Sequence, residues 1–160
     1  MKSFAMFVSK ALNVAIVLIL SVMSCLVFIN VVLRYGFNSS ISMTEELSRY
    51  LFVWLAFLGA IVAFGENQHV SVTMLTDRLS KYKRKVLYVF TDIAMLFCCY
   101  LIVSGSYTQF LLNINNLAPI SGIPLGVNYL ASVIAGVLIG IIIIARIIST
   151  LGLLVKGERE

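Results

Sequence analysis

The sequence predicts an all-α integral membrane protein with four transmembrane helices in one domain. The first observation is composition: 61% of the 160 residues are hydrophobic and 12% are charged, whereas a soluble domain carries about 25% charged residues. The second is a series of four long apolar runs separated by polar segments. Within the single domain 1–160 they predict spans at about 11–33, 47–65, 86–112 and 126–148.

The first run, Ala11–Leu33, contains 23 residues and no charged side chain. At about 1.5 Å of rise per residue, such a helix reaches about 34 Å, which is enough to cross a hydrocarbon core of about 30 Å. The apolar stretch of a cleaved signal sequence is shorter, about 7–15 residues. We therefore expect this run to be a retained transmembrane helix.

Lysine and arginine are distributed unevenly between the ends of these runs. Ten of the twelve lie in the N-terminal tail, in the segment 66–85 and near the C-terminus, and the other two are Arg34 and Arg49. Cytoplasmic loops of membrane proteins are enriched in these residues, so both termini are predicted to be cytoplasmic. Because the basic residues lie at helix ends rather than in an aromatic-interleaved patch, nucleic-acid binding is not predicted.

Charged residues gather where the second helix is expected to begin. Ser42 and Glu45 fit a Ser-x-x-Glu capping box, and Glu46 and Arg49 follow within the first two turns. Arg34 ends the first helix on the same side of the membrane, and residues three and four apart share a helix face. The four charged residues predict a clamp that joins the first two helices or a docking point for another protein. A substrate ion path is disfavoured, because the cluster lies at a helix end and not at mid-membrane.

The connector between the second and third spans mixes apolar and basic residues. This composition predicts a short amphipathic helix at about 67–82, lying in the cytoplasmic interface with its basic side chains toward anionic lipid. His69, near its start, is predicted to be an interfacial hydrogen-bonding residue.

Asp92 is an acidic residue inside a predicted span. An ionised group within lipid is costly and needs a partner. Arg146 in the fourth span lies at a similar depth if the last two helices are antiparallel neighbours. The sequence therefore predicts an ion pair between Asp92 and Arg146.

Small residues recur four positions apart along the second and fourth spans, where they form ridges on which helices approach closely in lipid. These ridges are Ala56 with Ala60, Gly59 with Ala63, and Ser132 with Gly136 and Gly140. They serve packing either within the chain or against another subunit. Trp54 lies in the second span away from the interfacial aromatic belt, so it is predicted to contact a partner or lipid.

Residues that would support catalysis or a prosthetic group are sparse. The three cysteines fall inside spans without a Cys-x-x-Cys pair, and a single histidine is too few for bis-histidine haem or a histidine-based zinc site. No pair of spans is broken near its centre by glycine or proline, as in many secondary transporters. The sequence predicts a scaffold or partner subunit that is not an enzyme and holds no cofactor or metal.

Several short motifs resemble the small membrane subunit of tripartite ATP-independent periplasmic (TRAP) transporters, the DctQ-type family. The similarity is densest from residue 34 to 79. The matching residues are Arg34-Tyr35, Glu45-Glu46-Leu47, Arg49, Trp54, Phe57-Leu58-Gly59, Ala63, His69, Ile123-Pro124 and Tyr129.

This resemblance implies a transport assembly in a bacterial inner membrane. A large elevator-type membrane subunit would carry the sodium and substrate sites, and a periplasmic binding protein would deliver an organic acid of the C4-dicarboxylate or sialic acid type. The present chain would be the scaffold, with Arg34, Glu45, Glu46 and Arg49 fixing its exterior end and the second and fourth helices offering packing surfaces. Phospholipid bound at the helix seams is left open.

Two alternatives belong to other functional classes. A small multidrug-type exporter also has four helices and works as a homodimer, but it relies on an acid in its first helix, where Ala11–Leu33 has none. A membrane-bound redox or biosynthetic enzyme is disfavoured by the missing clusters of cysteine, histidine and acidic residues.

Overall fold

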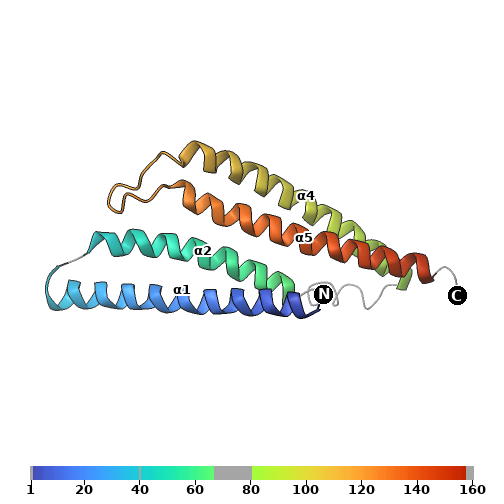
Figure 1. Ribbon diagram of the computed structural model, residues 1–160, viewed down its shortest axis with the longest axis horizontal. Helices are drawn as coiled ribbons and strands as arrows, with labels where there is room; N and C mark the ends of the chain where they lie inside the picture. The colour runs from blue at the N-terminus through green and yellow to red at the C-terminus, as the bar shows by residue number, and fades with distance from the viewer. Residues whose placement is uncertain (1, 40, 67–80, 158–160) are drawn as a thin grey trace.

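The computed structural model describes residues 2–39, 41–66 and 81–157, which form four long helices and the loop between the last two (Figure 1). Each contains a stretch long and apolar enough to cross a membrane, which confirms the predicted all-α fold. The predicted interfacial helix at about 67–82, with His69, lies almost wholly outside the described residues. The helices are α1 (Lys2–Gly36), α2 (Ser42–Glu66), α4 (Lys81–Asn113) and α5 (Gly126–Gly157).

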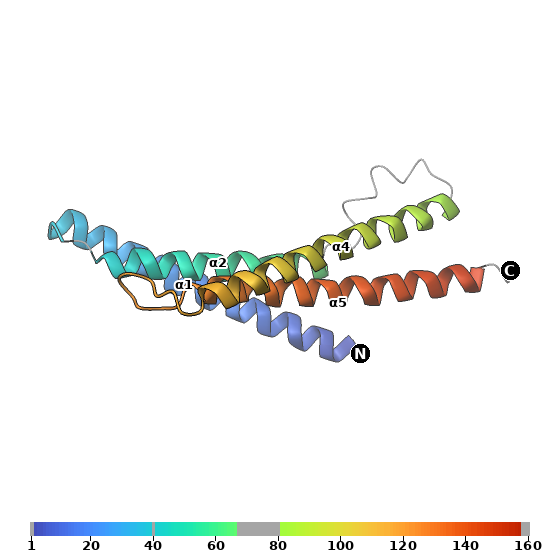
Figure 2. The ribbon, with the colours of Figure 1, turned by 90° about the horizontal axis from the view of Figure 1, so that it is seen from above.

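The four helices are arranged as an open row in the order α1, α2, α5, α4 (Figure 1). The main packing pairs are α1 with α2, α2 with α5, and α5 with α4. Figure 2 shows that the beginnings of α1 and α4 diverge on opposite sides of α5. We call the end of the row that holds residues 37–39 and 114–125 the loop end, and the opposite end, where α1 begins and α5 stops, the terminal end.

The turn between α1 and α2 is fixed by backbone and side-chain hydrogen bonds. Asn38 adopts a left-handed conformation with φ of 52°, which asparagine tolerates better than most residues. It allows the Ser39 N–H to donate to the Leu33 carbonyl at 3.1 Å, a common way to end a helix. The Ile41 N–H donates to the Asn30 side chain at 3.2 Å, so α1 holds the start of α2 beside it.

The predicted capping box at Ser42 is not formed. Ser42 is already the first helical residue of α2, and Thr44 donates its hydroxyl to the Ile41 carbonyl at 2.7 Å. The helix therefore begins five residues before the apolar span expected at 47–65. The polar residues of this first turn therefore lie inside the helix instead of marking its boundary.

The tightest packing in the row lies between α4 and α5, along the predicted ridge of small residues in the last helix. Ser132, Gly136 and Gly140 are buried. A Cβ atom added to Gly136 would come within 2.6 Å of a Val103 methyl group, whereas one added to Gly140 would meet Leu96 at an ordinary 3.9 Å. This ridge therefore packs within the chain, against α4.

Large apolar side chains are exposed on all four described helices. Along the span of α1 no residue is fully buried, and Val17, Leu18 and Phe28 each expose 60% or more of their surface. Contiguous apolar patches of this extent are uncommon on soluble monomers and mark membrane or protein contacts. The open row therefore suits surroundings of lipid and partner helices.

Candidate functional site

Helix α2 presents faces with different surroundings. Glu46, Tyr50 and Ile61 are buried, and the first two contact the loop that precedes α5. A face beside this buried one is exposed, although α2 packs against both α1 and α5, and we call it the open stripe; at about 100° per residue, its members recur every three or four positions. The open stripe consists of Glu45, Arg49, Phe52, Ala56, Ala60 and Ala63, with Gly59 half-buried at its edge.

The buried face of α2 anchors the loop between α4 and α5. The Glu46 carboxylate accepts a hydrogen bond from the Ser121 N–H at 3.1 Å, and the Tyr50 hydroxyl donates to the Ile123 carbonyl at 3.2 Å. The two side chains are one helical turn apart, so they hold two nearby points of the same loop. Residues far apart in the sequence are thereby tied together at the loop end.

The anchored loop has its own regular geometry. Leu117 and Pro124 form an isolated antiparallel bridge, and the Leu125 N–H donates to the Asn116 carbonyl at 2.8 Å. Gly122 lies at its tip with φ of 69°, which glycine adopts without steric cost. A Cβ on Gly126 would stand 3.1 Å from the Ile114 Cα, so the loop also closes tightly where α5 begins.

We predict that Tyr50→Phe loosens this loop without unfolding the helices. The change removes one hydrogen bond while keeping the ring, and such a bond contributes about 1 kcal/mol net. The Ala118 and Leu125 amides, which are hydrogen-bonded within the loop, should exchange with solvent about fivefold faster. Hydrogen-exchange mass spectrometry measures this. Thr44→Val, which removes a hydroxyl bond in the first turn of α2, is the matched control; unchanged exchange in Tyr50→Phe would contradict the anchoring role.

The predicted clamp of four charges is not present among the described residues. Arg34, Glu45 and Arg49 are exposed, and no ion pair joins any of them. Glu46 is buried, but it binds the loop backbone instead of an arginine. Glu45 and Arg49 lie on the open stripe, so docking of another protein at this cluster stays a prediction.

The predicted ion pair between α4 and α5 is present near the terminal end. Arg146 donates from Nε to Asp92 Oδ2 at 2.9 Å and from Nη2 to Asp92 Oδ1, so the guanidinium grips the carboxylate with two parallel bonds. Asp92 is only 3% exposed. The Arg146 guanidinium also lies over the Phe64 ring, 5.4 Å from its centroid, a distance at which cation and ring attract. Three helices thus meet at Arg146.

The remaining predicted residues are dispersed. Tyr35 is 84% exposed at the end of α1, and Trp54 is half-buried within α2. A Cβ on Gly59 would meet no atom within 4 Å, so this glycine serves no close contact inside the described part of the chain. His69 lies outside the described residues.

Sequence reasoning missed three contacts of this site. Tyr50 and Ser121 carried no recognised motif, and Ile123 was noted only for its family resemblance, although Tyr50 follows Glu46 by four positions and so shares its helix face. Phe64 looked like one apolar residue among many. Across the described ranges, no group of three or more histidine, cysteine, aspartate or glutamate side chains is placed to hold a metal ion.

Comparisons with known proteins find one matching family and several similar proteins. The family described as "Tripartite ATP-independent periplasmic transporters, DctQ component" matches residues 23–152. A Haemophilus influenzae protein whose name describes it as a TRAP transporter small permease protein is 60% identical over 158 residues, covering 99% of this chain and 98% of the relative. A second protein of the same organism and description is 34% identical, covering 83% of this chain and 81% of the relative.

A much longer relative contains a segment that is similar to this chain. The sialic acid TRAP transporter permease protein SiaT of another Haemophilus influenzae strain is 31% identical over 70 residues. The match covers 44% of this chain but only 11% of that relative. The similar segment is therefore a small part of a much longer permease chain.

Proposed function

Because the chain belongs to the DctQ component family of tripartite ATP-independent periplasmic transporters, we propose that it is the scaffold that holds the large permease subunit along the open stripe of α2. It is a small permease subunit and a transporter component, not an enzyme. Family membership leaves no support for the multidrug-exporter and redox-enzyme alternatives.

The observation that carries this proposal is the contrast between two ridges of the same kind. In α5 the small residues are covered by α4, with Gly136 in close contact with Val103. In α2, Ala56, Ala60 and Ala63 stay exposed. Small residues in lipid-facing helices permit close approach of another helix, and the much longer permease relative supports a large subunit as the source of that helix.

The charged residues at one end of the open stripe would fix the position of the partner helix along α2. Glu45 and Arg49 are exposed and unpaired with each other among the described residues, one turn apart at the loop end of α2. Polar groups at a helix–helix contact in lipid select partners that complete their hydrogen bonds. In the proposed contact they fix the loop end, while the alanines below them allow close packing.

The proposed assembly imports an organic acid across a bacterial inner membrane. The terminal end of the row faces the cytoplasm, as the excess of lysine and arginine in the tails and the connector supports. Sodium and an organic acid of the C4-dicarboxylate or sialic acid type bind the large subunit, to which a periplasmic protein delivers the acid. The SiaT relative, named as a sialic acid transporter, supports this substrate class.

We predict that Ala60→Leu separates the two subunits. Ala60 is exposed in this chain, so the change leaves the row of helices intact, but the larger side chain prevents close approach of the partner. Overpacking costs about 1–3 kcal/mol, which lowers association about tenfold. Mild-detergent purification of the tagged chain from its native membrane, with quantitative mass spectrometry, measures how much of the large polytopic subunit is recovered.

Ala94→Leu is the matched control, because Ala94 is an exposed alanine on α4, at the far edge of the row. It should recover the large subunit as the unaltered chain does. Recovery of self-associated chains alone from the unaltered protein would overturn the scaffold proposal. Equal loss in both variants would overturn the assignment to α2.

A further inference from the structure

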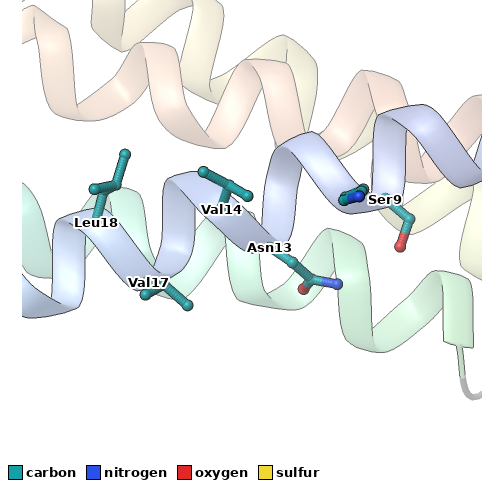
Figure 3. A pocket seen from close by; sticks show the side chains of 6 residues that line it. Ser9, Asn13, Val14, Val17 and Leu18 are labelled. Atoms are coloured by element: carbon teal, nitrogen blue, oxygen red, sulfur yellow. The ribbon is translucent and has the colours of Figure 1, made fainter.

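An open groove of about 480 Å³ runs along the first half of α1, and its aliphatic lining residues stay more than half exposed. Among the described residues its walls come from two parallel rows, each with a spacing of four. Figure 3 shows Val14 and Leu18 on one side of the helix and Asn13 and Val17 on the other. The rows are Ser9, Asn13 and Val17, and Lys10, Val14 and Leu18.

The chemistry of the groove changes along its length. Its first part holds a hydroxyl, an amide and the Lys10 ammonium, with no acidic residue among the described lining. The second part is aliphatic. At about 1.5 Å per residue, Val14 and Leu18 lie about 6 and 12 Å beyond Lys10 along the helix axis. The charge-free run of α1 begins at Ala11, directly after Lys10, so the polar part lies at the expected membrane boundary and the apolar part reaches inward.

Another transmembrane helix is a poor occupant for this groove. Helices in lipid approach each other through small residues, whereas here the rows carry Lys10 and three branched side chains. A helix laid over them would bury an unpaired ammonium, which is costly in lipid. The divergence of the beginnings of α1 and α4 in Figure 2 also leaves this half of α1 away from α4.

We propose that this groove binds one anionic phospholipid, with its phosphate group on Lys10 and polar contacts to Ser9 and Asn13. One acyl chain lies between the two rows, against Val14, Val17 and Leu18. A positive charge and donors at one end, followed by an exposed aliphatic surface that extends into the membrane, match the two parts of such a lipid. The site is on a different helix from the open stripe and does not depend on the proposed partner.

Lys10→Gln tests the proposal through lipid retention. The full chain, with any subunit that accompanies it, is purified in mild detergent, and bound lipids are counted by native mass spectrometry and titrated back with phosphatidylglycerol. A lysine near a membrane surface contributes about 1 kcal/mol to anionic lipid binding, so retention should fall about fivefold. Lys10→Arg should retain the lipid. Arg34→Gln, the same charge change at the other end of α1, should leave it unchanged.

Further titrations separate the lipid from other occupants. Phosphatidylcholine should bind more weakly than phosphatidylglycerol, and inorganic phosphate should fail to displace the bound lipid. Val17→Ser should also weaken lipid binding, because it alters the part of the groove that contacts the acyl chain and leaves the polar part unchanged. Equal retention in Lys10→Gln, equal binding of both lipids, or displacement by inorganic phosphate would each overturn the proposal. Circular dichroism of each variant verifies that the helices are intact.

Discussion

Asp92→Ala is expected to destabilise the chain by about 3–5 kcal/mol, because it leaves Arg146 charged and without its carboxylate inside the row of helices. Arg146→Ala should cost a similar amount, since Asp92 is only 3% exposed and would keep a buried negative charge. Resistance of the full chain to unfolding by SDS in mixed micelles measures both changes. The loss should appear as a lower SDS midpoint.

The pair is tested more strictly by coupling the two sites. If the residues act through each other, the double variant Asp92→Ala/Arg146→Ala should be less damaging than the sum of the single changes. The exchanged pair, Asp92→Arg with Arg146→Asp, should recover much of the stability. Additive losses, or no recovery in the exchanged pair, would contradict a direct role of the ion pair.

Phe64 gives an internal control for this prediction. Phe64→Leu removes the ring under Arg146 but leaves both charges and most of the apolar volume. Cation–ring contacts contribute about 0.5–2 kcal/mol, so the loss should be smaller than that of Asp92→Ala. A loss as large as that of Asp92→Ala would mean that Arg146 is held mainly by α2.

Asp92 and Arg146 could be paired from the sequence because each is a charge inside an apolar span, at a similar distance from the same membrane boundary. Two antiparallel neighbouring helices bring such residues to one depth, and the cost of an unpaired charge in lipid supplies the reason for contact. The contact of Phe64 with Arg146 could not be predicted in the same way, because nothing in the apolar pattern of α2 reveals which helix lies beside it. The order α1, α2, α5, α4 is a property of the packed chain.

The two adjacent glutamates show the same limit on a smaller scale. Glu45 and Glu46 are about 100° apart around the helix, so one faces the loop before α5 while the other faces outward. The sequence analysis assigned both to one charged cluster. It could not separate their roles, because the start of a helix favours negatively charged side chains even when they have no partner. The bonds from Ser121 to Glu46 and from Tyr50 to Ile123 depend on where the loop folds back, a contact across more than 70 residues.

The ridges of small residues in α2 and α5 also looked equivalent in the sequence, but a large side chain should affect stability very differently in the two. Gly136→Leu is expected to destabilise the chain by about 3 kcal/mol. The added Cβ alone would stand 2.6 Å from Val103 Cγ2, with the Cys99 carbonyl at 3.7 Å and Ile102 at 3.8 Å. Valine and isoleucine are stiff at χ1, so the clash is relieved only by separating α4 from α5. The SDS midpoint should fall accordingly.

Gly59→Leu provides the matched comparison, because it makes the same replacement in the other ridge. A Cβ at Gly59 meets no atom within 4 Å, so the chain by itself should keep its SDS midpoint. Within the proposed assembly the same change should reduce recovery of the large subunit, since Gly59 borders the open stripe. Gly136→Leu should thus lower the stability of the isolated chain, and Gly59→Leu should affect only the complex. If both variants lowered the SDS midpoint equally, the open stripe would be filled within the chain and unavailable to a partner.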